Sequence, residues 1–396
     1  MHRSPFLRIS LLILCSAAES ETPEQKRSLL ILPDINTDPN EGETFGILPV
    51  WMMKNVKGEV RRIYAPSLNY NKEAGVTGTF RLFDYPADEA EMELIASVSR
   101  ENNMRFVFDY VDREYAGSRY LIGGRVEYSQ DGFARFYGVG PDTRESAESN
   151  FSKDQLRMEA TVGAYLFSKF RIDFSEKFRM VDVERGLLND LPDTRQAFGN
   201  VSGTNGAQVW SHEVALTFDG RDNGNMPSEG ILVKLSGAFA IDELFGQVDY
   251  EKVTLDFRLF HSWGSPDRVT AVRLNTEAVA GDNIPFFELS ALGGSETLRA
   301  YGSDRISDRV RVLVNLEQRF IVHKRHVFGL DAEFEVSPFL DAGIVADDYG
   351  SLQIDDIKPV IGLGLRGLTR PDVVGTMDIG IGEEGVQVFL GLGYVF

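Results

Sequence analysis

The last eleven residues, Val386 to Phe396, carry an apolar side chain at every second position and end on an aromatic. The apolar positions are Val386, Val388, Leu390, Leu392, Tyr394 and Phe396, and the positions between them include Gln387, Gly391 and Gly393. Because successive side chains of a strand point to opposite faces, this pattern predicts a strand with one apolar face and one face suited to a crowded or wet interior. The chain is therefore constrained to place this segment in a β-sheet whose outer side is apolar.

The same alternation runs through most of the chain. From about residue 60 onward, segments with a period of two are separated by turns rich in Gly, Pro, Asn and Asp, which predicts an all-β fold. In the segment 170–181 one face carries Phe170, Ile172, Phe174 and Phe178, and the other carries Arg171, Asp173, Lys177 and Arg179. Glu176 is the one misfit, because it falls on the apolar face. A polar face with charges of both signs suits a hydrated lumen better than a packed core.

Two architectures fit such strands, a soluble β-sandwich and a membrane-spanning β-barrel. Sandwich strands average about 5 to 6 residues, whereas these segments extend to about 10 or more, the length that a tilted membrane strand needs. The connections also alternate between short turns, such as Ser168-Lys169, and long loops, such as residues 182–206 and 281–308. Short turns on one side and long loops on the other are typical of outer-membrane barrels. We therefore predict a sixteen-stranded antiparallel transmembrane β-barrel with both termini on the periplasmic side.

The alternation also sets the expected domain organisation. Strands are expected at residues 60–71, 75–85, 91–100, 103–113, 118–128, 156–167, 170–181, 208–219, 229–239, 249–262, 267–280, 309–322, 333–346, 358–367, 373–382 and 386–396. Arg3 and Arg8 precede the apolar run from Ile9 to Cys15, and the small residues Ser16, Ala17 and Ala18 follow it, so residues 1–18 are expected to be a secretory signal peptide. Residues 19–43 are predicted to be a polar periplasmic linker, and residues 44–396 the barrel. Residues 44–54 fit the register poorly and are left open as a periplasmic segment, a lumen insert or an extra strand.

Composition excludes several classes of function. The mean hydropathy of -0.18 and the lack of a later run of about 18 apolar residues argue against a helical membrane protein. A net charge of -19 argues against nucleic acid as a partner, because phosphate binding needs basic patches. No Ser-His or Asp-His constellation is visible, so a membrane-embedded hydrolase is disfavoured and a non-enzymatic protein without a cofactor is expected.

Three local patterns favour ordinary structure over a binding site. Gly362 to Gly367 matches the GxGxxG string but lacks the following helix that a dinucleotide site needs, so strand glycines explain it better. The histidines His323 and His326 flank two basic residues in a turn, which favours a solvated turn over a metal site. The acidic loop from Asp347 to Asp356 has the residue types that bind Ca²⁺, but a solvated outer loop explains it better.

One long connection contains a stronger candidate. The run Leu292 to Tyr301 (LGGSETLRAY) precedes the strand at 309–322, and its Arg299 follows a Gly-Gly pivot. Asp341 lies in FLDAG, on the face of its strand that also carries Glu335. If the loop folds into the lumen, Arg299 and Asp341 can form a charge-assisted hydrogen bond that rigidifies it. The alternative from spacing alone is an ordinary surface loop with an exposed Arg.

These motifs resemble a known family, the BamA/TamA-like bacterial surface-antigen superfamily of outer-membrane insertases and translocators. LGGSETLRAY is similar to the family's inward-folded sixth-loop motif, and FLDAG is similar to its thirteenth-strand Asp motif. Residues 136–140 (FYGVG) and 219–222 (DGRD) also fit, and the resemblance covers about residues 60 to 396. It implies that Leu298, Arg299, Ala300, Tyr301, Asp341 and Gly343 form a loop lock, and we name them the loop-lock residues.

The resemblance also shows two departures. Ala300 stands where the family has Gly, which is expected to restrict the backbone after Arg299. Studied members carry periplasmic POTRA domains, whereas about 25 polar residues precede Thr44 here, so a short form without POTRA domains is expected.

The expected function follows from the family. It is membrane protein or lipid assembly, or translocation, through a lateral seam between the first strand and Val386 to Phe396 in a bacterial outer membrane. Tyr394 and Phe396 are expected to serve as the C-terminal assembly signal. The expected partners are outer-membrane lipids, the assembly machinery that recognises this strand, and an unidentified periplasmic protein. The alternative is a structural barrel or passive pore without insertase activity.

Overall fold

The computed structural model describes residues 26–36, 40, 42–55, 60–101, 103–115, 119–242, 246–327, 330–369, 372–391 and 393–396. The signal peptide predicted for residues 1–18 lies outside the described residues. Among the described residues, no helix is both long enough and apolar enough to cross a membrane.

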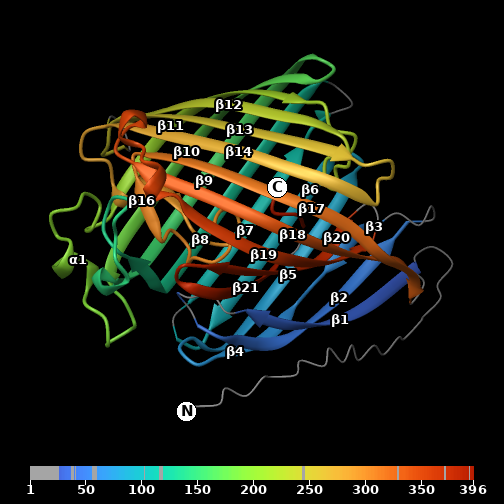
Figure 1. Ribbon diagram of the computed structural model, residues 1–396, viewed down its shortest axis with the longest axis horizontal. Coiled ribbons are helices and arrows are strands. Elements are labelled where there is room, and N and C mark those ends of the chain that lie inside the picture. Colours follow the sequence, from blue (N-terminus) through green and yellow to red (C-terminus); the bar gives the residue numbers. More distant parts are fainter. Residues whose placement is uncertain are drawn as a thin grey trace.

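One antiparallel sheet of nineteen strand segments forms the wall of a β-barrel (Figure 1). Its strands are β1 (Lys26–Asn36), β2 (Thr44–Lys54), β3 (Val60–Tyr64), β4 (Ser67–Asn71), β5 (Gly75–Ala87), β6 (Ala90–Ser99), β7 (Met104–Asp112), β8 (Tyr120–Phe136), β9 (Ser149–Phe167), β10 (Phe170–Arg185), β11 (Ala207–Asp219), β12 (Gly230–Ala240), β13 (Tyr250–Ser262), β14 (Arg268–Gly281), β17 (Val310–Val327), β18 (Leu330–Ala346), β19 (Lys358–Thr369), β20 (Asp372–Gly382) and β21 (Gly385–Gly391). β15 (Ser290–Leu292) and β16 (Ile306–Asp308) form a separate two-stranded sheet. The helical segments are α1 (Thr194–Ala197) and single turns at Glu145–Ala147, Phe286–Glu288, Tyr349–Ser351 and Ile354–Asp356.

The ladder follows chain order, so each strand of the wall pairs with its sequence neighbour. β3 and β4 both pair with β2 and with β5, and therefore act as one strand interrupted at residues 65 and 66. All sixteen predicted strands overlap strands of this sheet, and the all-β antiparallel barrel is confirmed. The count of sixteen is not, because β1 and β2 extend the wall at its N-terminal end.

The prediction of a polar linker at residues 19–43 is wrong for Lys26–Asn36, which form β1. The stretch from Leu29 to Leu32 is apolar, and β1 pairs with β2 along its whole length, with Leu30 opposite Val50. β2 is the segment 44–54 whose role the sequence left open, and among the three possibilities it is the extra strand. A partner strand thus supplies the backbone hydrogen bonds that a polar linker would take from water.

The two faces of the wall differ as the alternation predicts. Outward side chains such as Val162, Val253 and Ile361 are apolar and exposed. Inward side chains form ion pairs across neighbouring strands, among them Arg125 with Asp109 at 2.9 Å and Lys177 with Glu213 at 2.8 Å. This division fits a wall with an apolar environment outside and a polar lumen inside.

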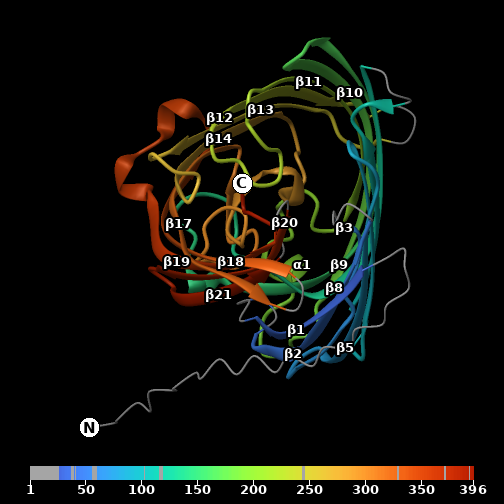
Figure 2. The ribbon, with the colours of Figure 1, turned by 90° about the vertical axis from the view of Figure 1, so that its right-hand side faces the viewer.

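The C-terminal segment departs from the predicted strand. β21 ends at Gly391, and Gly393 has a φ of +84°, a conformation that glycine adopts without a steric penalty. Phe396 is buried inside the barrel against Phe260, Val269 and Ala271. The prediction that Tyr394 and Phe396 lie on the apolar outer face is therefore wrong, and Figure 2 shows the C-terminus within the ring of strands.

Candidate functional site

The connection between β14 and β17 folds into the barrel, and its tip forms the candidate site. Gly293 and Gly294 both have positive φ values, +121° and +90°, at the point where the loop turns. Thr297 closes this turn, because its hydroxyl donates to the Gly293 carbonyl and accepts from the Gly293 N–H, each at 2.8 Å. The Gly-Gly pair therefore supplies the pivot that the sequence indicated.

The tip is held by an apolar cluster against the inner wall. From the loop come Leu292, Leu298, Ala300, Tyr301 and Ile306, and from β17, β18 and β19 come Leu313, Phe339, Val345 and Val360. Burial raises the pKa of Tyr301 to about 12, and the nearby charge of Glu383 adds to the shift. The tip of the loop is therefore part of a buried hydrophobic core and is not a surface loop.

Arg299 lies at the centre of the site and is completely buried. Its Nε donates to Asp341 Oδ2 at 2.9 Å, its Nη2 to Asp341 Oδ1 at 2.7 Å, and its Nη1 to Glu317 Oε1 at 2.6 Å. The guanidinium carbon also lies 3.5 Å from the centre of the Phe339 ring. Burial alone would lower the pKa of Arg299, but the carboxylates outweigh it and raise the pKa above its ordinary value. The side chain therefore stays charged, with each guanidinium nitrogen bonded.

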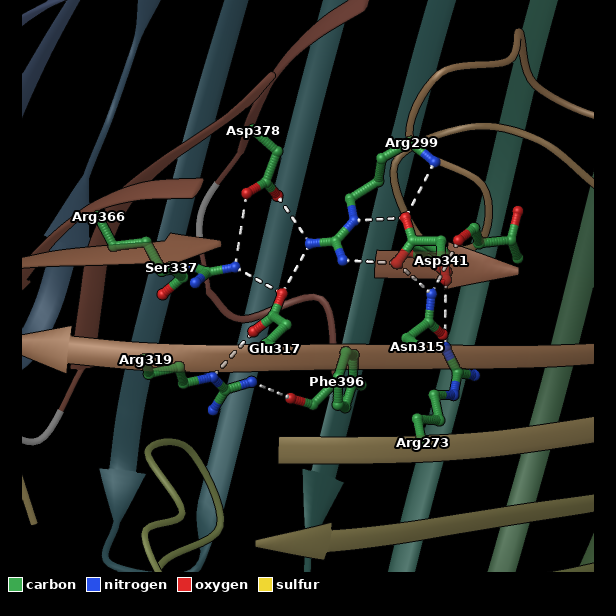
Figure 3. A network of polar contacts seen from close by, with 12 residues as sticks. Arg273, Arg299, Asn315, Glu317, Arg319, Ser337, Asp341, Arg366, Asp378 and Phe396 are labelled. Atoms are coloured by element: carbon green, nitrogen blue, oxygen red, sulfur yellow. Dashed lines mark hydrogen bonds and ion pairs between the residues drawn. The ribbon is translucent and has the colours of Figure 1, made fainter. Parts of the chain in front are cut away.

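Arg299 belongs to a larger buried network of three arginines and four carboxylates (Figure 3). Arg366 of β19 donates to Glu317 at 2.8 Å and to Glu335 at 3.1 Å. Arg319 donates to the other oxygen of Glu317 at 2.9 Å, so Glu317 joins all three cations. Removing one member of such a network leaves a buried charge without a partner, which typically costs about 3 to 5 kcal/mol.

Two further members complete the network. Asp378 of β20 lies 3.6 Å from Arg299 and 3.5 Å from Arg366. Asn315 donates to Asp341 at 2.8 Å and to the Thr297 carbonyl at 2.9 Å, which ties the loop backbone to the same carboxylate.

The C-terminal segment is bound to the same network. Arg319 donates to the Phe396 carbonyl at 3.1 Å, and its guanidinium lies 3.8 Å from the centre of the Tyr394 ring. The Tyr394 hydroxyl donates to Glu335 at 2.7 Å. One buried cluster therefore connects the inserted loop with the residues that follow the last strand.

Glycines on the wall make room for the loop. A Cβ at Gly380 of β20 would collide with the Arg299 carbonyl oxygen, and one at Gly382 would lie 2.9 Å from the Ala300 Cβ. A Cβ at Gly343 would meet Leu292 at 2.8 Å and Leu298 at 3.2 Å. The restriction expected at Ala300 is absent, because Ala300 is not among the residues with positive φ.

A second anchor holds the same loop to another part of the wall, at β10 and β13. Glu288 is buried and accepts from Arg179 of β10 at 2.9 Å and from the Tyr250 hydroxyl of β13 at 2.9 Å. Lys252 donates to the Glu288 backbone carbonyl at 2.9 Å. The loop therefore connects β10 and β13 with β17 to β20 through the lumen.

The structure brings all six loop-lock residues together, including the predicted contact between Arg299 and Asp341. The sequence reasoning missed Glu317, Arg319, Arg366, Asp378 and Glu288. The first four are charged residues on the lumen faces of β17, β19 and β20. The alternation of polar and apolar residues predicts that these side chains face the lumen, but it does not predict which residues they contact. Glu288 had no distinguishing pattern.

The weaker sequence candidates fall into ordinary structure. Gly362 lies in β19, where the Phe339 ring occupies the space of a Cβ. His326 Nδ1 lies 2.8 Å from Asp331 Oδ1, and both residues are exposed. No group of three or more potential metal ligands is found within the part of the chain that is described.

Comparison with known proteins agrees with this architecture. A family model described as the Omp85 superfamily domain matches residues 90–366. The outer membrane protein assembly factor BamA of Nitratidesulfovibrio vulgaris is 27% identical over 238 residues, which are 55% of this chain and 28% of that protein. The matched region thus spans little more than a quarter of that curated relative.

Two solved structures have the same fold. BamA from Haemophilus ducreyi lacking POTRA domains 1–3 gives a TM-score of 0.56 at 13% identity, covering 92% of this chain and 75% of that one. CdiB from Escherichia coli gives a TM-score of 0.51 at 10% identity, covering 95% of this chain and 64% of that one.

Proposed function

The chain belongs to the Omp85 superfamily and is a bacterial outer-membrane protein, and from this premise we propose that it assembles or translocates membrane proteins or lipids through a lateral seam between β1 and β21. The role proposed is non-enzymatic. Outer-membrane lipids, the assembly machinery of that membrane and a periplasmic protein are the proposed partners.

The state of the last strand is the observation that carries the proposal. β21 has only seven residues and pairs with β20 along all of them. β1 lies beside β21, but the ladders of the described residues include none between these two strands. Leu32 of β1 packs instead on Gly375 of β20, just beyond the last β20–β21 pair, Thr376 with Gly391. A barrel whose ends meet without a continuous ladder opens there at the lowest cost in hydrogen bonds.

This position corrects the seam expected from the sequence. The first strand was expected at residues 60–71, whereas the structure begins the wall at β1, so the proposed seam lies two strands earlier in the chain. The other edge is still the C-terminal strand, shortened to Gly385–Gly391.

The buried network supports a seam whose state is coupled to the loop. Glu317 bonds to Arg299 of the loop and to Arg319, which holds the Phe396 carbonyl. A change in the last strand that withdraws Tyr394 and Phe396 would take partners from Arg319 and Glu335. We infer that the loop lock stabilises the closed seam.

The proposal is tested by locking the seam. Cysteines are introduced at Ile31 and Leu390 in a Cys15→Ser background and joined with a short thiol crosslinker. The matched control joins Leu390 to Met377, its register partner on β20. Both proteins are reconstituted in liposomes, and the insertion rate of an unfolded barrel protein is measured.

We expect the seam crosslink to abolish the acceleration of barrel-protein insertion. The β20–β21 crosslink should leave that acceleration unchanged. Full activity of the seam-locked protein would contradict the lateral route. No acceleration by the uncrosslinked protein would contradict the assembly role itself.

A passive pore is the second candidate, because the lumen wall carries ion pairs such as Arg125 with Asp109. A pore would conduct steadily in a planar bilayer and show ion selectivity. Because the inserted loop lies in the lumen, we expect no conductance or only rare openings. A steady large conductance would favour the passive pore.

A further inference from the structure

Glu176, the misfit of the sequence pattern, belongs to a polar cluster on the outer, lipid-facing wall. Its carboxylate bonds to His212 Nδ1 at 2.8 Å and accepts from Trp210 Nε1 at 2.8 Å. The His212 ring lies 4.9 Å from the ring of Phe239. The three polar residues come from β10 and β11, and Phe239 from β12.

The surroundings show that this cluster faces outward. Phe174 and Val214, the neighbours two residues away on the same face of each strand, are 42% and 43% exposed. Lumen-facing residues between them, such as Lys177 and Glu213, pair with each other inside the barrel. The Glu176 side chain itself remains 39% exposed, and the His212 side chain 19%.

The cluster lies near the outer-leaflet edge of the hydrocarbon. Phe218 lies at the periplasmic end of β11, and the centre of its ring is 4.9 Å from the centre of the Phe170 ring. Trp210 is eight residues further along the same strand, which corresponds to about 20 Å of height for a strand tilted by about 40°. An apolar band is about 25 Å tall and is bordered by aromatic residues at both edges. Trp210 therefore lies close to the outer aromatic border, and Glu176 and His212, two positions nearer the periplasm on their strands, lie about 5 Å below Trp210.

A second cluster at the periplasmic edge provides a comparison. Trp263 Nε1 donates to the Thr270 hydroxyl at 2.7 Å, and Thr270 donates to Gln318 at 2.6 Å. This cluster has the same design, a tryptophan bonded to neighbouring strands, but its members are neutral. An ionisable pair on a lipid-facing surface is costly, and such residues usually mark a functional position. Anchoring a tryptophan thus does not require the charge found at Glu176.

We propose that Glu176, His212 and Trp210 bind the acyl-linkage region of an outer-leaflet glycolipid, the class whose linkage carries amide N–H and hydroxyl donors. A carboxylate accepts hydrogen bonds only and has about four acceptor positions, of which two are used here. Ester linkages of diacyl phospholipids present acceptors and cannot serve it. His212 Nε2 has no partner among the described residues and faces the same ligand as a second polar contact.

Charge argues against a lipid phosphate as the bound group. Toward the outer end of the same wall lie further acids, with Asp154 of β9 opposite Asp182 of β10. The acceptor-rich site therefore favours neutral donors over an anion. The inference depends on the membrane location of the barrel and not on the seam or the assembly role.

The test uses the intact barrel in detergent with equimolar lipid A and a diacyl phosphatidylcholine, whose headgroup has no N–H or O–H donor. Bound lipid is counted by native mass spectrometry for the wild type, Glu176→Leu, His212→Phe and the control Gln318→Leu. We expect lipid A to be preferred, and Glu176→Leu to lower its occupancy about tenfold, as the loss of hydrogen bonds to a charged group predicts. Gln318→Leu should leave the occupancy unchanged.

A second measurement does not depend on the folding of these variants. In a Trp51→Phe, Trp263→Phe background, Trp210 is the one remaining tryptophan, since the chain has three. The fluorescence emission of Trp210 should shift on addition of lipid A and not on addition of phosphatidylcholine. Equal binding of both lipids, unchanged occupancy in Glu176→Leu, or an unresponsive Trp210 would each overturn the proposal.

Discussion

At the scale of single residues, Arg299 shows why a guanidinium is needed at the tip of the loop. Its three nitrogens reach two carboxylates on different strands, Asp341 on β18 and Glu317 on β17. A lysine ammonium is a point charge without this fork, so it cannot hold both carboxylates in the same geometry. The residue therefore works as a three-way connector and not only as a positive charge.

We expect Arg299→Ala to destabilise the folded barrel by about 3 to 5 kcal/mol, because it leaves Asp341 and Glu317 buried and unpaired. Arg299→Lys should recover part of this loss. The midpoint of heat modifiability on seminative gels measures the effect. The control is Arg309→Ala, whose partner Asp347 is 74% exposed and whose ion pair should contribute under about 1 kcal/mol. Equal midpoints for Arg299→Ala and Arg309→Ala would rule out the lock.

At the scale of elements, the loop and β20 fit each other because β20 has glycines where the loop backbone passes. Gly380→Ala should expel the loop tip, since the new Cβ would occupy the position of the Arg299 carbonyl oxygen. Limited proteolysis between residues 292 and 301 detects the released loop. Gly237→Ala in β12 is the matched control, because nothing lies within 4 Å of its added Cβ. Protection of the loop in Gly380→Ala would contradict the close approach.

The turn between β11 and β12 gives a pH-dependent prediction. Partial burial alone would raise the pKa of Asp222, but hydrogen bonds from Ser228 and Glu229 outweigh it and hold the pKa below its ordinary range. A lowered folded pKa means that the turn is stabilised above the ordinary carboxyl pKa of about 3.9 and loses this contribution as the pH falls through the folded value.

We therefore expect amide exchange in residues 223–229, corrected for the intrinsic pH effect, to accelerate at pH 3 relative to pH 6. In the Asp222→Asn variant, amide exchange in these residues should be fast at both pH values. A turn that is equally protected at pH 3 would show that the carboxylate does not hold it.

The elements also show how far sequence reasoning reaches. Strict alternation located all sixteen predicted strands, because a wall with two different environments enforces a period of two. β1 was missed because its alternation is broken, with Leu29 to Leu32 apolar in succession and Pro33 following, so that only its pairing with β2 defines it. The contact of Arg299 with Asp341 was reached from strand parity as one of two alternatives, and motif resemblance then favoured it. Glu317 and Arg366 could not be assigned, since their roles depend on which strands meet across the lumen.

The inward turn of the C-terminal segment was missed for another reason. Tyr394 and Phe396 continue the apolar alternation of β21, so the pattern predicts one longer strand. The tertiary environment overrides it, because Arg319 and Glu335 supply polar partners inside the barrel that an outer face would lack. Gly391 and Gly393 indicated that the backbone could turn at this point, but they did not indicate that it would turn inward.

At the scale of the whole molecule, the inserted loop braces the barrel across its lumen. Glu288 is fixed to β10 and β13, and Arg299 is fixed to β17 and β18. Because both anchors are buried ion pairs on one loop, their loss should be coupled and not additive.

We expect the wild-type barrel to be nearly silent in planar bilayers and the double variant Glu288→Gln, Arg299→Ala to show frequent conductance steps. The control pairs Glu251→Gln with Arg309→Ala, two exposed or half-exposed positions outside both anchors. Steady conductance of the wild type, or silence of the double variant, would show that the loop does not close the lumen.

The burial of Phe396 has a consequence for the timing of biogenesis. The assembly signal expected at Tyr394 and Phe396 would be accessible only before the barrel closes, because in the closed barrel Phe396 is 4% exposed and packs against residues of β13 and β14. If this segment is the assembly signal, completion of the fold hides it from the factor that binds it. Mature copies would not compete with newly made ones for the same receptor, and delivery would run in one direction.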